Sequence, residues 1–344
     1  MRTCTWAPTV FQGNQVVDKH TQPSLVPEGE DLAQLTQQIV KRYEALGLSD
    51  LLIAQRWWGN GEDIEASSLD CLAMTSFFAS HTEHLNLITA IHPGFFHPTV
   101  LAKWASTLQR LTSGRWGINV TSGWNMDEFT MYGVDQLSHD ERYDRSKEFI
   151  DLLRLCWSEE RFSFSGRYYQ CEGLVLEPRP THPLEIFQGG QSPAAIAMAA
   201  EKSDWMFLNG GSVERIGEII SQVRHACKDT GRTVRFAMYA APLCRESDAL
   251  AWAEIDARLA KIDHDLVEQR KARLQGGAHG MWGDDNDPLS HLDSNEGFAA
   301  RLIGSPETIL ERIETYRDLG VEMLHMDLRD KMFCEVVLPT VTAL

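Results

Sequence analysis

The chain has 344 residues, of which 43% are hydrophobic and 24% are charged, so it has the composition of a folded globular protein and not of a disordered one. At about 150 residues per domain, this length fits either two domains or one (β/α)8 barrel with additions. Its 49 Asp and Glu against 32 Lys and Arg give a formal charge of −17, which argues against nucleic acid and anionic membranes as partners, because phosphate contacts need basic side chains.

Short apolar runs alternate with helical patterns along most of the chain. Apolar residues recur every three or four positions in the stripes Leu32–Leu46, Val100–Leu111 and Ile309–Tyr316, which indicates amphipathic helices. Eight apolar runs are predicted to be strands: Thr3–Thr9, Leu51–Ala54, Leu85–Ile91, Trp116–Thr121, Glu185–Gln188, Trp205–Leu208, Val234–Ala241 and Glu322–Met326.

This alternation of strands and helices is typical of parallel βαβ units. A doubly wound sheet would usually have fewer strands, and no G-x-G-x-x-G motif follows any of them. We therefore predict a (β/α)8 TIM barrel, and we expect residues 1–344 to form a single domain.

Two segments interrupt the alternation. Residues Phe162–Tyr169 are predicted to form a small hairpin outside the barrel. Residues 245–298 form an insertion after the seventh strand, which becomes rich in Gly, Asp and His between Gly276 and Asn295. Because so long a loop in a compact domain is usually a lid or disordered, we expect a mobile lid that places Trp282 or His279 over the pocket. The alternative is a surface insertion with no role.

The seven cysteines are scattered and no C-x-x-C motif occurs, which predicts free thiols and neither a zinc site nor a disulfide framework. His81 and His84 lie three positions apart but lack carboxylate or Cys partners at ligand spacing, so we expect no metal. The N-terminus lacks a signal-peptide pattern, and no apolar run approaches the ~18–20 residues of a membrane span. We therefore expect a cytoplasmic protein with no membrane partner.

In a (β/α)8 barrel the active site lies at the carboxyl ends of the strands. The sequence places many aromatic residues and few carboxylates there. These aromatic residues are Trp6, Trp57, Trp58, Phe95, Phe96 and Trp124. Such a set is suited to the wall of a pocket for a flat apolar ligand, although the same residues would also serve to cap the barrel.

The segment from Gly189 to Pro193 joins the fifth strand to a helix. Ser192 suits the N-cap position and Pro193 suits the first helical position. The glycines before them would let backbone N–H groups approach an anion at the helix N-terminus. The segment is therefore a candidate phosphate site, although an ordinary strand-to-helix turn has the same composition.

Polar candidates lie in two other loops. Ser138–Glu141 is a capping box, and the helix that it opens carries Arg142 and Tyr143 in its first turn, where the arginine is either an anion clamp or a solvated charge. His92 and His97 flank a Pro-Gly turn, and either is a candidate proton donor or a structural histidine. The absence of G-x-S-x-G, P-loop and H-E-x-x-H motifs excludes the commonest hydrolases, nucleotidases and metalloproteases.

Taken together, several motifs resemble those of the bacterial-luciferase-like flavin monooxygenases, over about residues 30–325. The resemblance is closest to the branch of dimethylsulfone, alkanesulfonate and pyrimidine-ring oxygenases. The motifs are Thr107–Trp124, His139–Tyr143, the Phe162–Tyr169 hairpin, Phe187–Ser192 and Leu302–Pro306.

The resemblance implies a TIM barrel that uses reduced FMN and O2, with the flavin supplied by a separate NAD(P)H-dependent flavin reductase. It implies a homodimer or homotetramer acting on a small organic substrate. It further implies that flavin contacts come from Gln55, Arg56, Asn119 and Glu128, and phosphate contacts from Arg142, Tyr143, Gly190 and Ser192. The substrate pocket is expected to be lined by Trp6, Trp57, Phe95, Trp124 and Tyr239, with His92 or His97 as proton donor.

One departure from the family bears on the substrate. Alkanesulfonate enzymes carry an Arg and a His on the seventh strand, where this chain aligns Tyr239 and Ala241. Because a sulfonate clamp needs a cation, this favours a substrate that is neutral or held differently, such as a sulfone or a related organosulfur compound. A monooxygenase for a larger biosynthetic intermediate, an F420-dependent oxidoreductase and a non-catalytic flavin-binding protein stay as alternatives.

Overall fold

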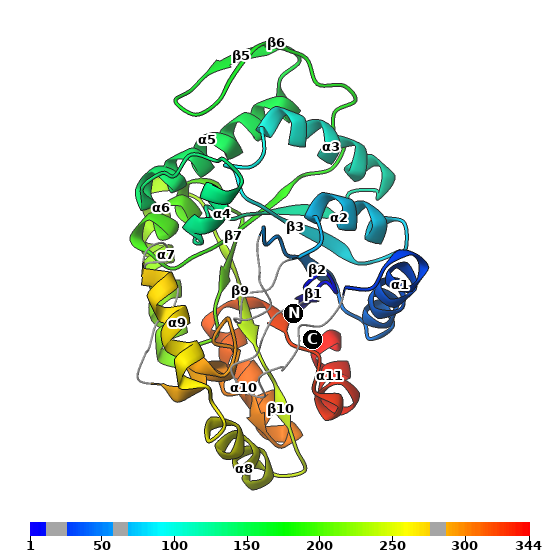
Figure 1. Cartoon of the computed structure of the whole chain (residues 1–344), viewed down its shortest axis with the longest axis vertical. Helices are drawn as coiled ribbons and strands as arrows, with labels where there is room; N and C mark the ends of the chain where they lie inside the picture. Colours follow the sequence, from blue (N-terminus) through cyan, green and yellow to red (C-terminus); the bar gives the residue numbers. More distant parts are fainter. Residues whose placement is uncertain (12–25, 58–67, 276–286) are drawn as a thin grey trace.

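The computed structural model describes residues 1–11, 26–57, 68–275 and 287–344 (Figure 1). Eight parallel strands close into a barrel in which each strand pairs with its neighbours in chain order, and the last pairs with the first. They are β1 (Arg2–Trp6), β2 (Asp50–Ile53), β3 (Asn86–Ile91), β4 (Trp116–Val120), β7 (Glu185–Gly189), β8 (Trp205–Leu208), β9 (Arg235–Ala240) and β12 (Val321–Met326). The predicted (β/α)8 barrel is confirmed.

Helices surround the barrel strands (Figure 1). Many begin at a Ser, Asp or Asn whose side chain accepts a backbone N–H, as Ser212 and Ser305 do, which stabilises a helix start. They are α1 (Gly29–Ala45), α2 (Cys71–Ala79), α3 (Pro98–Leu111), α4 (Met126–Met131), α5 (His139–Ser158), α6 (Pro193–Lys202), α7 (Val213–Thr230), α8 (Asp248–Leu259), α9 (His264–Gln275), α10 (Pro306–Leu319) and α11 (Leu338–Ala343), with the 3-10 turns η1 (Pro288–His291) and η2 (Gly297–Ala300) and the π-turn η3 (Phe333–Val337).

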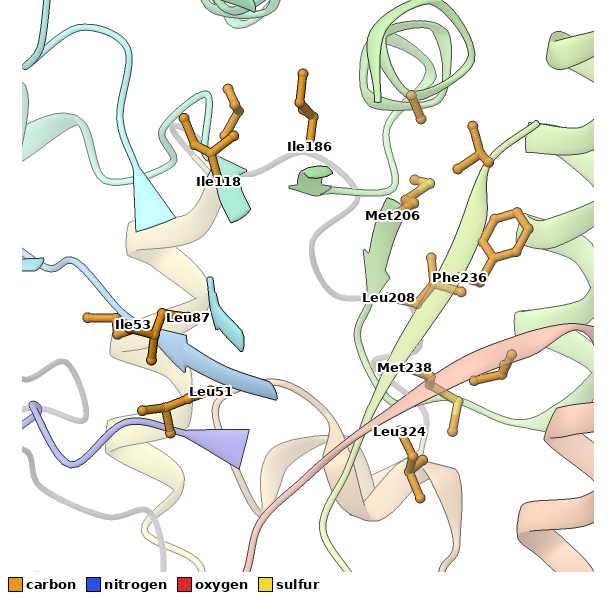
Figure 2. Close-up of a cluster of buried hydrophobic side chains, with 14 of the residues drawn as sticks. Leu51, Ile53, Leu87, Ile118, Ile186, Met206, Leu208, Phe236, Met238 and Leu324 are labelled. Atoms are coloured by element: carbon orange, nitrogen blue, oxygen red, sulfur yellow. The ribbon is translucent and has the colours of Figure 1, made fainter. Parts of the chain in front are cut away.

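Side chains alternate across each barrel strand, as the pleat requires. One set packs outward against the helices, and Figure 2 shows members from several strands, among them Leu51, Ile118 and Met238. The intervening residues, such as Leu52 and Ala237, pack with one another in a separate cluster. The interior of the barrel is therefore filled with side chains, so a polar site can form only at the two ends of the barrel.

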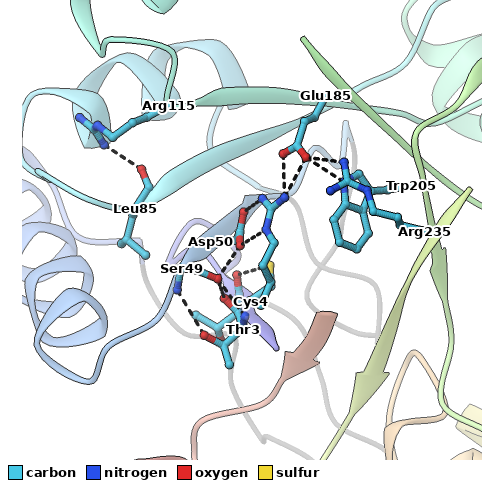
Figure 3. A network of polar contacts seen from close by, with 11 residues as sticks. Thr3, Cys4, Ser49, Asp50, Leu85, Arg115, Glu185, Trp205 and Arg235 are labelled. Atoms are coloured by element: carbon cyan, nitrogen blue, oxygen red, sulfur yellow. Dashed lines mark hydrogen bonds and ion pairs between the residues drawn. The ribbon is translucent and has the colours of Figure 1, made fainter. Parts of the chain in front are cut away.

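The amino-terminal rim is closed by a network of ion pairs (Figure 3). Arg2 at the start of β1 donates through Nε to the Asp50 carboxylate at 2.9 Å and through Nη1 to Glu185 at 2.8 Å. Glu185 also accepts from Arg235 at 2.7 Å and from the Trp205 indole at 3.0 Å. The first residues of five strands are thereby joined at the end of the barrel opposite to the strand carboxyl termini.

Some element boundaries differ from the predicted ones. β1 ends at Trp6 and does not reach Thr9, since Pro8 has no N–H for a sheet ladder. The predicted hairpin exists, but its strands are β5 (Phe162–Ser165) and β6 (Gln170–Leu174), so that Tyr168 and Tyr169 belong to the turn. The hairpin projects beyond α3 and α5, outside the barrel, as expected (Figure 1).

The insertion after the seventh barrel strand is confirmed. It starts after β10 (Leu243–Cys244), which pairs with β11 (Ile303–Gly304) beyond it, and contains α8, α9, η1 and η2. The expected positions of His279 and Trp282 lie outside the described residues, as does most of the Gly-rich stretch. Within the described ranges, no helix is long and apolar enough to cross a membrane.

Candidate active site

A cavity of about 210 Å³ lies at the carboxyl ends of the barrel strands. It shares Trp6, Arg56 and Tyr239 with a larger groove of about 1540 Å³ beside the insertion. The cavity brings together predicted residues from the ends of six barrel strands, or the loops that follow them, and from α5. These are Trp6, Gln55, Arg56, His92, Asn119, Trp124, Tyr143, Gly190 and Tyr239.

The other predicted residues lie around this cavity but do not line it. His97 is exposed at the start of α3, where its Nδ1 lies 2.7 Å from the Thr99 hydroxyl. Arg142 is buried and donates from Nη1 to the Leu137 carbonyl at 3.0 Å. Ser192 is buried and caps α6, accepting from the Ala195 N–H at 3.2 Å.

The remaining three of these residues form a support behind the cavity wall. The Trp57 and Phe95 rings stack with centroids 4.3 Å apart. The Glu128 carboxylate accepts the Trp57 N–H at 3.0 Å, and the Tyr132 hydroxyl donates to the Trp57 carbonyl at 2.9 Å. Glu128 therefore holds the backbone of an aromatic residue beside the cavity, and its contact with the flavin stays a prediction. Trp58 lies outside the described residues.

His92 is positioned by this support. Trp57 Nε1 donates to His92 Nδ1 at 3.3 Å, so the proton of the neutral imidazole is on Nε2. Burial lowers the pKa of His92 to about 4, and the positive charges of Arg56 and Arg145 act in the same direction. Near neutral pH the ring is therefore an uncharged donor with a fixed tautomer.

The loop from β7 to α6 has the geometry predicted for it. Gly190 has a φ of +108°, and a Cβ at this position would lie 2.7 Å from the Tyr143 hydroxyl oxygen. Burial raises the pKa of Tyr143, while its hydrogen bond with Ser192 acts in the opposite direction. Glycine at 190 thus allows a neutral phenol to close against the backbone of the loop.

Gln191, which follows, is a wall residue that the sequence reasoning missed. Arg215 Nη2 donates to Gln191 Oε1 at 2.5 Å, and Arg215 Nη1 is paired with Glu296 at 3.1 Å. This contact fixes the amide so that Nε2 is its free end, and Nε2 is buried without a hydrogen-bond partner among the described residues. Asn119 Oδ1 is also buried without a partner among the described residues, so these two amides give the cavity a free donor and a free acceptor.

His325 on β12 is a second missed residue. It lines the cavity, is only 2% exposed, and its Nε2 has no hydrogen-bond partner in the described part of the chain. Its ring lies 4.5 Å from the Trp6 ring and 5.1 Å from the Tyr239 ring, centroid to centroid. Burial lowers the pKa of His325 to about 3. The signal was present in the sequence, because His325 follows the inward-facing Met323 by two positions on a predicted strand.

Buried polar atoms are normally hydrogen-bonded, so unpartnered ones in one cavity indicate a missing ligand with both donors and acceptors. A flavin ring and its ribityl chain have both kinds of group. Among the described residues, no group of three or more His, Cys, Asp or Glu could hold a metal ion.

Comparisons with known proteins agree with this arrangement. The sequence profile of the luciferase-like monooxygenases matches residues 10–323. An FMNH2-dependent dimethylsulfone monooxygenase from Pseudomonas putida is 34% identical over 354 residues, covering 98% of this chain and 94% of that protein.

Two solved structures share the architecture. Riboflavin lyase has a TM-score of 0.79 at 18% identity, covering 100% of this chain and 91% of that one. DmoA from Hyphomicrobium sulfonivorans has a TM-score of 0.74 at 20% identity, covering 100% of this chain and 88% of that one. At these identities the likeness shows a shared fold alone.

Proposed function

This chain belongs to the luciferase-like monooxygenase family, and from this premise we propose that it oxidises a small neutral sulfone with reduced FMN and O2. The resemblance found in the motifs is confirmed, and the protein is an FMNH2-dependent monooxygenase. For dimethylsulfone the balanced reaction is (CH3)2SO2 + FMNH2 + O2 → CH3SO2H + CH2O + FMN + H2O. The single observation that supports the substrate class is the uncharged, aromatic wall formed by β1, β8, β9 and β12.

The residues of the cavity fit a flavin. Asn119 Oδ1 can accept from it and Gln191 Nε2 can donate to it, since both atoms are buried without partners among the described residues. The phosphate end is assigned to the β7–α6 loop with Gly190, Tyr143 and Ser192, where the start of α6 favours an anion. Reduced FMN supplies two electrons and activates O2, and the protein's part is to bind, orient and exclude water.

The substrate side of the cavity differs from a sulfonate site. Arg56 is the only Lys or Arg among the described residues that line the cavity, and its guanidinium lies over the Trp124 ring at 5.6 Å. Around His325 the wall consists of the rings of Trp6, Phe207 and Tyr239. None of these rings carries a charge, so they offer an organic anion no ion pair, whereas the methyl groups of a sulfone would be buried against them.

His92 is assigned as the proton donor in preference to His97. It lines the cavity with its Nε2–H as the donor, while His97 is exposed at the start of α3. Because the Trp57 indole holds its Nδ1 and fixes its tautomer, His92 can donate a hydrogen bond from Nε2 toward the reacting groups without changing charge.

We also propose a cytoplasmic homo-oligomer. All seven cysteines are free thiols, which suits a reducing compartment. Val100 and Leu111 on α3 are 69% and 77% exposed, and apolar side chains on one helix suit a contact with a second copy.

A coupled assay tests the proposed function. The protein is incubated with FMN, NADH, a flavin reductase and dimethylsulfone, and methanesulfinate and formaldehyde are quantified. We expect both products in a 1:1 ratio, and none from an alkanesulfonate of similar size. Sulfonate turnover without sulfone turnover would contradict the substrate class, and turnover with reduced F420 in place of FMN would contradict the cofactor.

A further inference from the structure

His325 is the polar group in the cavity whose chemistry the flavin and the proton donor do not use. It is 2% exposed, and its Nε2 is buried without a hydrogen-bond partner in the described residues. His92 in the same cavity differs, because Trp57 satisfies its Nδ1 at 3.3 Å. One histidine is thus held by the protein, and the other keeps an unused hydrogen-bonding atom.

The surroundings of His325 are aromatic on three sides. The ring centroids of Trp6, Tyr239 and Phe207 lie 4.5, 5.1 and 5.7 Å from that of His325. The Tyr239 hydroxyl is itself engaged, since it is hydrogen-bonded by Trp6. No charged side chain is in ion-pair contact with the imidazole in the described structure, so the ring is held neutral by burial.

A buried polar atom without a partner lowers the stability of the fold, and Leu or Phe would fill the same space without this loss. A neutral imidazole offers one N–H and one lone pair. A ligand that is enclosed by these aromatic rings can place its apolar groups against them. If that ligand also carries an oxygen, the imidazole N–H can donate a hydrogen bond to it.

We infer that His325 is a substrate-positioning residue that donates a hydrogen bond from its imidazole N–H to an oxygen of a neutral substrate, while the Trp6, Phe207 and Tyr239 rings enclose the apolar groups. The substrate class is a small uncharged molecule with a strong oxygen acceptor between short alkyl groups. This inference rests on the proposed sulfone oxidation and assigns a recognition contact within it.

Binding measured without turnover tests the inference. Dimethylsulfone and dimethyl sulfide, which lacks the oxygens, are titrated into the protein with oxidised FMN and followed by ligand-observed NMR. For His325→Phe we expect the Kd of the sulfone to rise about 10-fold or more, because one hydrogen bond is lost, with little change for the sulfide. His325→Gln keeps a donor near the Nε2 position and should recover most of the sulfone affinity.

The controls separate a positioning role from a structural one. His84→Phe replaces a histidine whose side chain is 84% exposed and should leave both affinities unchanged. FMN affinity, read by flavin fluorescence, should stay within twofold of the wild type in the His325 variants, which also reports their folding. If both probes lose affinity equally in His325→Phe, or neither does, the inference is wrong.

The test also separates the inference from the proposed function. If the wild type binds the sulfone in a His325-dependent way but makes no sulfinate, the positioning role stands and the reaction assignment is overturned. If the wild type oxidises the sulfone and His325→Phe binds it as tightly, the reaction stands and the positioning role is overturned. If the wild type binds no sulfone, the inference is overturned.

Discussion

His92 and His325 are two neutral imidazoles in one cavity, and their burial links the site to the pH dependence of stability. Burial lowers the pKa of His92 to about 4 and that of His325 to about 3. The unfolded chain binds these protons at an ordinary histidine pKa of about 6.5. Between pH 6.5 and pH 4 the unfolded state therefore holds more protons than the folded state, so stability falls as the pH falls.

The first prediction concerns how steeply the free energy of unfolding falls as the pH falls. From pH 7 to pH 5, each of the two histidines should remove about 2 kcal/mol from the free energy of unfolding, at about 1.4 kcal/mol per pKa unit. His325→Phe should lose less stability than the wild type over the same range, by about that amount. Urea unfolding at the two pH values measures both slopes, and parallel losses in the two proteins would refute the prediction.

The second prediction concerns Gly190, whose φ of +108° and contact with Tyr143 both require glycine. Gly190→Ala should cost about 1–3 kcal/mol of stability through backbone strain, and it should weaken FMN binding at least about 10-fold. Flavin fluorescence quenching measures the affinity. Gly231→Ala is the matched control, because Gly231 at the end of α7 also has a positive φ, of +67°, but does not line the cavity, and a Cβ there meets no atom within 4 Å. Equal FMN affinity in the two variants would show that the loop does not hold the phosphate.

The residue scale also shows what the sequence could not reveal. Asn119 lies near the carboxyl end of one predicted strand and Gly190 two residues beyond another, so barrel geometry alone places them at the cavity. The strand pattern could place His325 on the inward face of β12, but its ring contacts with Trp6, Phe207 and Tyr239 join residues far apart in the chain and were not predicted. The hydrogen bond from the Trp57 amide to Glu128 was not predicted, since the direction of a side chain depends on contacts that spacing does not encode.

At the element scale, the strands and helices of the barrel were predictable because each spans several residues with a clear period. The β10–β11 pair was not, as two-residue strands have no periodicity. The Arg2 network was not predicted either, because it joins the first residues of strands that are distant in sequence.

The third prediction tests this network. Arg2→Met leaves the fully buried Asp50 carboxylate without its cation and should lower the free energy of unfolding by about 3 kcal/mol. Adding Asp50→Leu removes the stranded charge and should recover much of this loss, which urea unfolding will measure. FMN affinity should stay unchanged in the double variant, since the network lies at the opposite rim from the cavity. A double variant less stable than Arg2→Met would contradict the argument.

At the scale of the whole molecule, one barrel accounts for most of the described chain, and its strand ends form one cavity beside one groove. The insertion contributes to that cavity through Asn295, which also accepts the Gly210 N–H at 3.0 Å. Whether residues 245–298 act as a lid stays a prediction, since the expected closing residues lie outside the described ranges. The proposed flavin occupies this cavity. In the described residues no strand is followed by a G-x-G-x-x-G turn, which would be the mark of a separate NAD(P)H site.

The fourth prediction concerns the source of the reduced flavin. Because reducing FMN requires NAD(P)H to bind beside it, the purified protein given NADH, FMN, O2 and dimethylsulfone alone should make no sulfinate. Adding a flavin reductase, or FMN reduced photochemically without any reductase, should start product formation at the same yield per reduced flavin. This equality matters, because it shows that the reductase supplies only reduced flavin and no catalytic group. Oxidation of NADH by this chain without a reductase would place both half-reactions in one barrel and refute the two-component arrangement.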